Sequence, residues 1–212
     1  MIWELQMIYE DVSMDAQYMD AVKREDMETA QRMVDAAAKN AGFTMKGDHG
    51  SVVKNFERFD PTKQGTTTDG GLFSKGFYFF RTGGDAARNS AYPNKRTFFL
   101  KITNPYHIAI SDRSLRDASV KEQREGRTAK ILQKEGFDGV MVWNVSGRYP
   151  ELKNAKGIDR ESQPRTQDIE YLREMVVYDP TRIKSADPVT YENKKPIPLS
   201  ERFNQSTDNI KY

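Results

Sequence analysis

Short apolar stretches separated by polar ones limit what this chain of 212 residues can fold into. Aromatic and β-branched residues favour a pleated, half-buried surface, and four stretches have that composition. None of the four exceeds seven residues: 76–80 (GFYFF), 96–102 (RTFFLKI), 137–143 (FDGVMVW) and 174–179 (EMVVYD). No apolar run approaches the ~20 residues that cross a bilayer, so we expect short strands and no membrane-spanning segment.

A helical pattern precedes these strands. Alanine, methionine and valine recur at helical spacing over residues 27–41. Asp26 stands where its carboxylate can cap the first turn, and Gly42 stands where a helix commonly ends. We therefore predict a helix here, flanking the sheet that the strands form.

Other segments have helical or turn character. We predict a short helix over 86–92 and a charged helix over 114–135 that Gly126 interrupts. Residues 60–71 (DPTKQGTTTDGG) and 144–168 are rich in turn residues, and we expect the first of these to be a mobile loop.

The order of helices and strands favours one α+β domain over residues 1–212. Within it, residues 1–42 form a helical lead-in. Residues 184–212 have the composition of a tail, and we expect this tail to pack back on the domain.

The composition excludes several classes of protein. The 33 lysines and arginines nearly balance the 31 acidic residues and are spread along the chain, which is not the clustered basic face of a nucleic-acid-binding protein. There is no cysteine, so neither a disulfide nor a thiolate metal site forms. The first fifteen residues lack the pattern of a signal peptide or membrane anchor. We expect a cytoplasmic monomer with no metal site.

Three motifs occur in a fixed order along the chain. The first is His49-Gly50-Ser51, the second contains Tyr78 (SKGFYFF), and the third contains Glu174 (REMVVYDP). Each alone has a plain structural explanation. A histidine before glycine is typical of a turn, a tyrosine in an aromatic strand of core packing, and a glutamate at a strand start of a solvent-facing carboxylate.

Together the motifs resemble the His-Tyr-Glu signature of ADP-ribosyltransferases of the diphtheria-toxin and poly(ADP-ribose)-polymerase type. The similarity is greatest to the ADP-ribosyltransferase-like domains of polyvalent proteins of phages and conjugative elements, and it runs from about Tyr18 to Tyr212. This resemblance implies the split-sheet fold of that family. In that fold, two small, mostly antiparallel sheets pack at a steep angle around a cleft that binds NAD as the substrate.

The resemblance also implies a role for each site residue. His49 would bind the adenosine ribose, Gly50 would offer its backbone to the nicotinamide carboxamide, and Ser51 would support that contact. Tyr78 and Tyr92, the latter at the end of NSAY, would be aromatic walls for the nicotinamide.

Glu174 would stabilise the cationic ribose of the transition state, and with His49 and Tyr78 it completes the implied catalytic set. The sequence departs from the arginine-modifying toxins, which carry Glu or Gln two residues before the catalytic glutamate, because Leu172 stands there. Glu170 is expected to be a solvated neighbour, with a role in positioning the acceptor as the second interpretation. His107 matches no functional position, so we interpret it as structural.

The implied activity is mono-ADP-ribosyl transfer from NAD to a macromolecule, with a host protein as the expected acceptor. The sequence leaves two alternatives open. Water could replace the acceptor, which would make the protein an NAD glycohydrolase, or the fold could serve as a binding module without catalysis.

Overall fold

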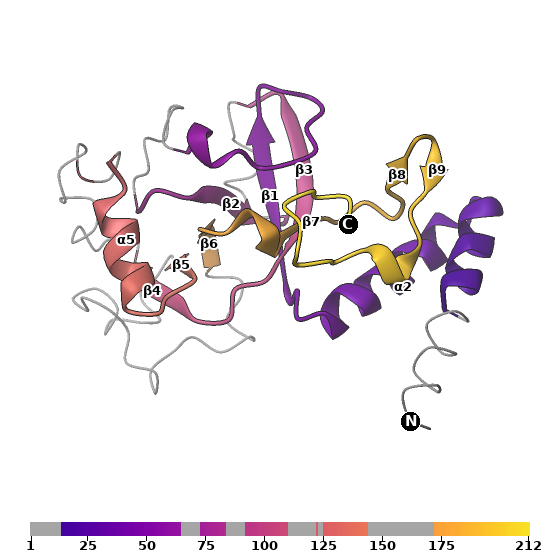
Figure 1. The fold of residues 1–212 in the computed structure, drawn as a ribbon, viewed down its shortest axis with the longest axis horizontal. Helices are drawn as coiled ribbons and strands as arrows, with labels where there is room; N and C mark the ends of the chain where they lie inside the picture. Colours follow the sequence, from indigo (N-terminus) through magenta and orange to yellow (C-terminus); the bar gives the residue numbers. More distant parts are fainter. Residues whose placement is uncertain (1–13, 65–72, 84–91, 110–121, 123–124, 144–171) are drawn as a thin grey trace.

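The computed structural model describes residues 14–64, 73–83, 92–109, 122, 125–143 and 172–212 (Figure 1). Within these ranges a seven-stranded sheet has the order β4-β5-β6-β2-β1-β3-β7, and β8 and β9 form a separate pair. Only β4 and β5 pair in parallel. The strands are β1 (Met45–Ser51), β2 (Phe77–Arg81), β3 (Asn94–Leu100), β4 (Pro105–Ala109), β5 (Gly139–Trp143), β6 (Leu172–Val177), β7 (Ile183–Ser185), β8 (Tyr191–Glu192) and β9 (Lys195–Pro196). With its helices, this is the α+β composition predicted from the sequence.

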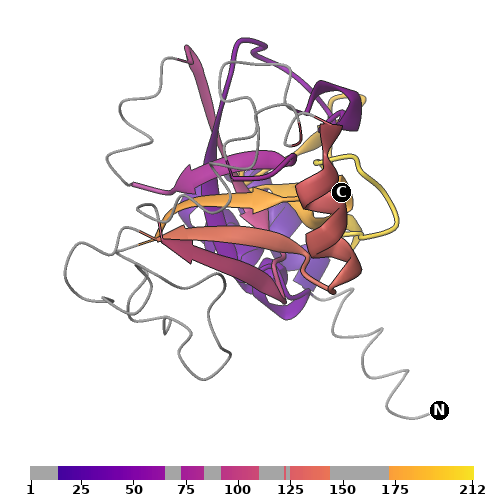
Figure 2. The ribbon, with the colours of Figure 1, turned by 90° about the vertical axis from the view of Figure 1, so that its left-hand side faces the viewer.

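The sheet is nearly divided between β1 and β2. Strand β1 pairs with β3 along all seven of its residues but with β2 at only two positions, Gly47 with Arg81 and Asp48 with Phe80. Figures 1 and 2 show β1 and β3 running steeply across the direction of β2 and β6. Where two separate sheets were expected, the structure therefore has two halves joined by this short contact.

Glycine makes the crossing possible. A Cβ atom at Gly47 would lie 2.7 Å from the Cβ of Phe79 on β2, closer than real side chains approach. Any larger residue would push β1 away from β2 at the point where the two halves meet. We refer to this place, where β1 leaves β2 beyond the Asp48–Phe80 pair, as the split.

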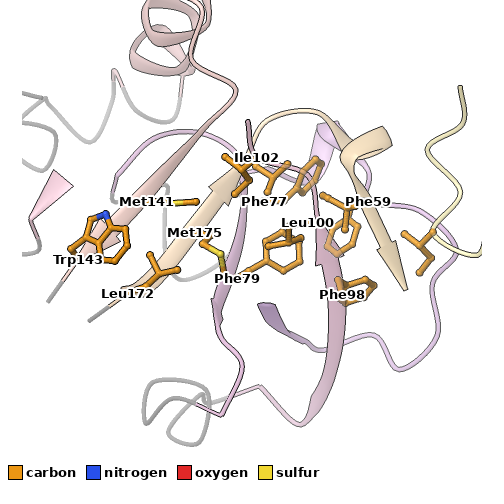
Figure 3. Packing of buried hydrophobic residues seen from close by; sticks show 13 residues of the cluster. Phe59, Phe77, Phe79, Phe98, Leu100, Ile102, Met141, Trp143, Leu172 and Met175 are labelled. Atoms are coloured by element: carbon orange, nitrogen blue, oxygen red, sulfur yellow. The ribbon is translucent and has the colours of Figure 1, made fainter. Parts of the chain in front are cut away.

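The main core lies on one face of the sheet and extends across the split (Figure 3). Side chains from β2, β3, β5 and β6 alternate along their strands, and those of one parity enter this core. Its buried members are Phe59, Phe77, Phe79, Phe98, Leu100, Ile102, Met141, Trp143, Leu172, Met175, Val177, Ile183 and Ile210.

Helices cover the two halves separately. Helix α2 (Met27–Asn40) begins at Asp26, whose carboxylate accepts a hydrogen bond from the backbone N–H of Thr29 (3.0 Å), as the sequence predicted. Its buried alanine and valine residues, together with Tyr18 and Ala21 of the preceding helical segment, form a cluster with Phe99 of β3. Helix α5 (Arg127–Lys134) buries Leu132 against the aliphatic side chains of β5 and β6.

The C-terminal residues bind to the sheet and to the segment after β1. Strand β7 extends the sheet beside β3. The buried ammonium of Lys184 donates to the carbonyl oxygens of Thr207 (2.8 Å) and Asn209 (3.1 Å). The backbone of Ile210 links Ser185 to Glu57, since its C=O accepts from the first and its N–H donates to the second.

The plain structural explanation of His49-Gly50 as a turn does not hold, because both residues lie inside β1 and pair with β3. One local prediction was wrong. Strand β4 was not predicted, because Asn104-Pro105 was interpreted as a strand end. Proline is tolerated as the first residue of an edge strand, and Pro105 begins β4 at the edge of the sheet.

Several predicted segments lie wholly or largely outside the described residues: most of the loop 60–71, the helix 86–92, the first part of the helix 114–135, the segment 144–168 and Glu170. Short 3-10 turns occur at Pro61–Lys63, Pro180–Arg182 and Leu199–Glu201. In the part of the chain that the structure describes, no helix has the length and apolarity needed to cross a bilayer.

Candidate active site

Tyr78 and Glu174 project from the same face of adjacent strands. The Cα atoms of Phe80 on β2 and Glu174 on β6 are register partners, and partners share a face. Tyr78 lies two residues before Phe80 and therefore points to the same side. Both polar side chains belong to the face opposite the main core, close to the split.

Glu174 is held in a mostly enclosed position. Its side chain is 13% exposed, and its Oε1 accepts a hydrogen bond from Nε of Arg173 at 3.1 Å. The Arg173 side chain is 45% exposed, so the carboxylate lies inside and the guanidinium on the solvent side. A carboxylate so placed is largely removed from bulk water, so its interactions with neighbouring charges are less screened than at the surface.

The phenol oxygen of Tyr78 is fully engaged by the chain itself. It accepts from the backbone N–H groups of Phe73 (3.0 Å) and Ser74 (3.1 Å) and donates to the carbonyl of Ser74 (2.6 Å). Burial raises the pKa of Tyr78 far above its usual value, and the charge of Glu174 raises it further. The hydroxyl is therefore a structural anchor that stays protonated, and the ring is the part of Tyr78 that can serve a ligand.

His49 bridges the split. Its Nδ1 lies 2.8 Å from the carbonyl oxygen of Tyr78. A carbonyl oxygen only accepts, so Nδ1 carries the hydrogen and donates it. The imidazole thus replaces a backbone bond at the place where the β1–β2 ladder stops. Burial lowers the pKa of His49, so the ring is neutral at pH 7 and its Nε2 is an acceptor.

Aromatic rings surround His49. The centroid distances are 4.9 Å to Phe59, 5.5 Å to Phe79, 6.1 Å to Phe56 and 6.4 Å to Phe98. These rings belong to or pack against the main core, whereas the ring of Tyr78 packs in the cluster under α5. The structure therefore joins His49 to Tyr78 through a backbone carbonyl and places their side chains in different clusters.

The remaining predicted site residues lie nearby along the chain. Gly50 and Ser51 are in the part of β1 that pairs with β3 after the split. The Ser51 hydroxyl accepts from the backbone N–H of Val53 (3.0 Å), which orders the turn out of the strand. Tyr92 is half-buried just before β3.

Sequence reasoning missed one acidic group at this place. Asp48 pairs with Phe80 across the split, and Phe80 pairs with Glu174, so the three residues form one row on one face. The Asp48 carboxylate accepts from the hydroxyls of Thr97 (2.8 Å) and Thr82 (3.1 Å). The sequence signal for Asp48 was its position directly before His49, because neighbouring residues of a strand face opposite sides of the sheet.

His107 lies outside this site. It is buried in β4, where its Nδ1 accepts a hydrogen bond from the indole N–H of Trp143 (2.9 Å). Burial lowers the pKa of His107 to about 4. Among the residues that the structure describes, no three histidine, aspartate or glutamate side chains gather as a metal site.

Comparison with known proteins identifies a family for most of the chain. The model of the family described as "ADP-Ribosyltransferase in polyvalent proteins" matches residues 39–192. These residues include β1, β2 and β6, which carry His49, Tyr78 and Glu174. No curated protein matches the chain, and no solved structure does.

Proposed function

Because the chain belongs to the ADP-ribosyltransferases of polyvalent proteins, we propose that it cleaves NAD and transfers the ADP-ribose to a macromolecule. The bond between nicotinamide and C1′ of the ribose breaks, and its electron pair goes to the pyridinium nitrogen. Nicotinamide leaves as a neutral molecule, so the leaving group needs neither a metal ion nor a general acid. A lone pair of the acceptor then forms the new bond to C1′.

Glu174 is the catalytic residue in this proposal. The ribose becomes oxocarbenium-like as the bond breaks, and a fixed negative charge beside it lowers the barrier. The enclosed carboxylate of Glu174 supplies that charge and accepts a hydrogen bond from the ribose 2′-hydroxyl. The interaction strengthens in the transition state, which is the condition for accelerating the reaction.

The nicotinamide binds against Tyr78. Its hydroxyl is held by the backbone of residues 73 and 74, so the ring is fixed and stacks without losing further freedom. Tyr92 forms the second aromatic wall. Gly50 offers backbone groups to the carboxamide, where a side chain would block the approach, and Ser51 supports it.

His49 holds the adenosine ribose. With Nδ1–H donated to the carbonyl of Tyr78, its Nε2 is an acceptor for a ribose hydroxyl. One NAD molecule thereby contacts both halves of the sheet, because His49 belongs to β1 whereas Tyr78 and Glu174 belong to β2 and β6. The observation that carries the proposal is that His49 bonds the backbone of Tyr78, while Tyr78 and Glu174 share one face beside the split.

The acceptor is proposed to be a protein of the cell in which the enzyme acts, consistent with the phage and mobile-element setting of polyvalent proteins. The enzyme is proposed to act as a monomer in the cytoplasm. Hydrolysis of NAD is the competing outcome, because water reaches the same carbon when no acceptor is bound.

Glu174→Gln is the decisive variant. It keeps the size and polarity of the side chain and removes the charge, so NAD cleavage should fall by roughly a thousandfold, in the range known for loss of one transition-state contact. NAD affinity should change little. Glu135→Gln, on an exposed carboxylate after α5, is the matched control.

The measurement uses NAD labelled in the adenine and a host lysate. Label on protein indicates transfer, and free ADP-ribose alone indicates hydrolysis. Wild-type turnover in the Glu174→Gln protein would remove Glu174 from the mechanism, and the absence of any NAD cleavage by the wild type would overturn the proposed function.

A further inference from the structure

A β-bulge lies beside Glu174. On β5, Val142 is the register partner of Glu174 and Trp143 is the partner of Leu172, so Arg173 is an extra residue with no partner in this ladder. Bulges re-aim side chains and are frequent next to functional sites.

The bulge changes where Arg173 points. In an unbroken strand, Arg173 and Glu174 would face opposite sides of the sheet. Here the Nε of Arg173 instead donates to the carboxylate of Glu174 at 3.1 Å. The chain therefore places a guanidinium directly beside the proposed catalytic carboxylate, at an irregularity whose effect is to bring the two together.

Arg173 lies on the outer side of this pair. Its side chain is 45% exposed against 13% for Glu174. Leu172, the residue before it, is buried in the main core and faces away. The guanidinium is thus the more exposed member of the pair.

We propose that Arg173 selects a carboxylate side chain of a protein as the acceptor of ADP-ribose, an inference that rests on the function proposed above. A guanidinium binds a carboxylate through two parallel N–H donors and repels a lysine or arginine acceptor. Arg173 exchanges Glu174 for the acceptor carboxylate, which leaves Glu174 to the ribose.

The chemistry balances without a further catalytic group. A glutamate or aspartate acceptor is already ionised at neutral pH, so no base has to remove a proton. A carboxylate oxygen lone pair forms the bond to C1′, the bond from C1′ to nicotinamide breaks, and neutral nicotinamide leaves. The product is an ester of ADP-ribose.

A protein is favoured over the phosphate terminus of a nucleic acid. Binding of nucleic acid depends on several basic side chains clustered along the backbone contact. The chain has a net charge of only +2, with 33 basic and 31 acidic residues spread along it. One guanidinium next to the reacting carbon is suited to a single carboxylate.

The test compares probe acceptors: poly-L-glutamate, poly-L-arginine and single-stranded DNA, each with labelled NAD. The wild type should label poly-L-glutamate roughly tenfold faster than poly-L-arginine, the ratio expected for a partly shielded charge contact. Hydroxylamine, which cleaves such esters, should release the label. Arg173→Lys should keep most of the preference, Arg173→Gln should lose it, and Arg173→Glu should reverse it.

Arg32→Gln is the control, since Arg32 is also paired with a glutamate but on the exposed face of α2. It should keep both the rate and the ratio. Thermal melts check that the Arg173 variants are folded, and a structural role for Arg173 would not reverse the acceptor ratio in a folded protein.

The outcomes separate the two proposals. If NAD is cleaved but poly-L-arginine or DNA is labelled as fast as poly-L-glutamate, or if no probe is labelled, the acceptor inference is wrong while NAD cleavage stands. The acceptor inference is also wrong if Arg173→Gln labels poly-L-glutamate and poly-L-arginine in the same ratio as the wild type. If the wild type cleaves no NAD under any condition, the proposed function fails and takes this inference with it.

Discussion

The two histidines of this chain sit in strands at different places in the sheet, and their rings are in opposite tautomers. His49, at the split, donates from Nδ1 to a carbonyl and keeps Nε2 as an acceptor. His107, on the edge strand β4, accepts at Nδ1 from Trp143, so its hydrogen is on Nε2. The two histidines thus differ in the partner of Nδ1, which the residue type alone does not reveal.

Their surroundings differ as well. His49 is half-buried among four phenylalanine rings, and its Nδ1 bonds the backbone carbonyl of Tyr78. His107 is 5% exposed, and its Nε2 has no hydrogen-bond partner among the described residues. We therefore expect His49 to matter for activity and His107 for stability.

The largest effect should appear when acid unfolds the protein. Burial holds the pKa of His107 at about 4 in the folded state, against 6.5 when unfolded. Below pH 6.5 the unfolded chain takes up a proton that the folded chain refuses. Stability from this residue is complete above pH 6.5 and is lost as the pH falls towards 4, by on the order of 3 kcal/mol.

Urea unfolding of the wild type and of His107→Phe between pH 7 and pH 4 measures this term. As the pH falls, the unfolding free energy of the wild type should decrease relative to that of His107→Phe. Parallel curves for the two proteins would show that His107 is not a buried neutral ring.

The next effect separates the histidines by activity. His49→Phe keeps an aromatic ring among the four phenylalanine rings that surround this position, which we call the His49 cage. It removes both the bond to Tyr78 and the acceptor Nε2. The kcat/KM for NAD cleavage should fall roughly 30-fold, equivalent to about 2 kcal/mol for lost hydrogen bonding. His107→Phe should stay within about threefold of the wild type. Equal losses of kcat/KM in the two variants would show that the two histidines do not differ in their importance for activity.

The smallest effects concern pH and metal. The lowered pKa of His49 keeps its ring neutral above pH 6.5, and the leaving group needs no acid, so the rate of NAD cleavage should vary less than about twofold from pH 6.5 to 8.5. EDTA should leave it unchanged. A narrow bell-shaped profile in this range, or inhibition by EDTA, would point to a different mechanism.

The sequence predicted local structure best where one residue decides it. Asp26 caps α2 as expected, and the strand at Phe77–Arg81 is read directly from its aromatic residues. The local sequence left open whether His49-Gly50 forms a turn or a strand, because the pairing with β3 that decides it comes from residues more than forty positions away. Long-range pairing overrides the local turn preference of glycine.

For the candidate site, the sequence proposes a set of residues but not their geometry. The motifs point to His49, Tyr78 and Glu174, and the structure puts the latter two on one face. Three features required coordinates: the bond from His49 to the backbone of Tyr78, the row through Asp48, and the bulge at Arg173. Each depends on strand register, which composition and spacing do not determine.

The hydrogen bond from Ile210 to Glu57 has a consequence for synthesis of the protein. It fastens the segment that carries Phe59, a wall of the His49 cage, to a residue that follows every strand of the sheet along the chain. During translation this hydrogen bond can form only after Ile210 has left the ribosome, because contacts this distant in sequence form late. The segment that carries Phe59 is therefore among the last parts of the described structure to be fastened.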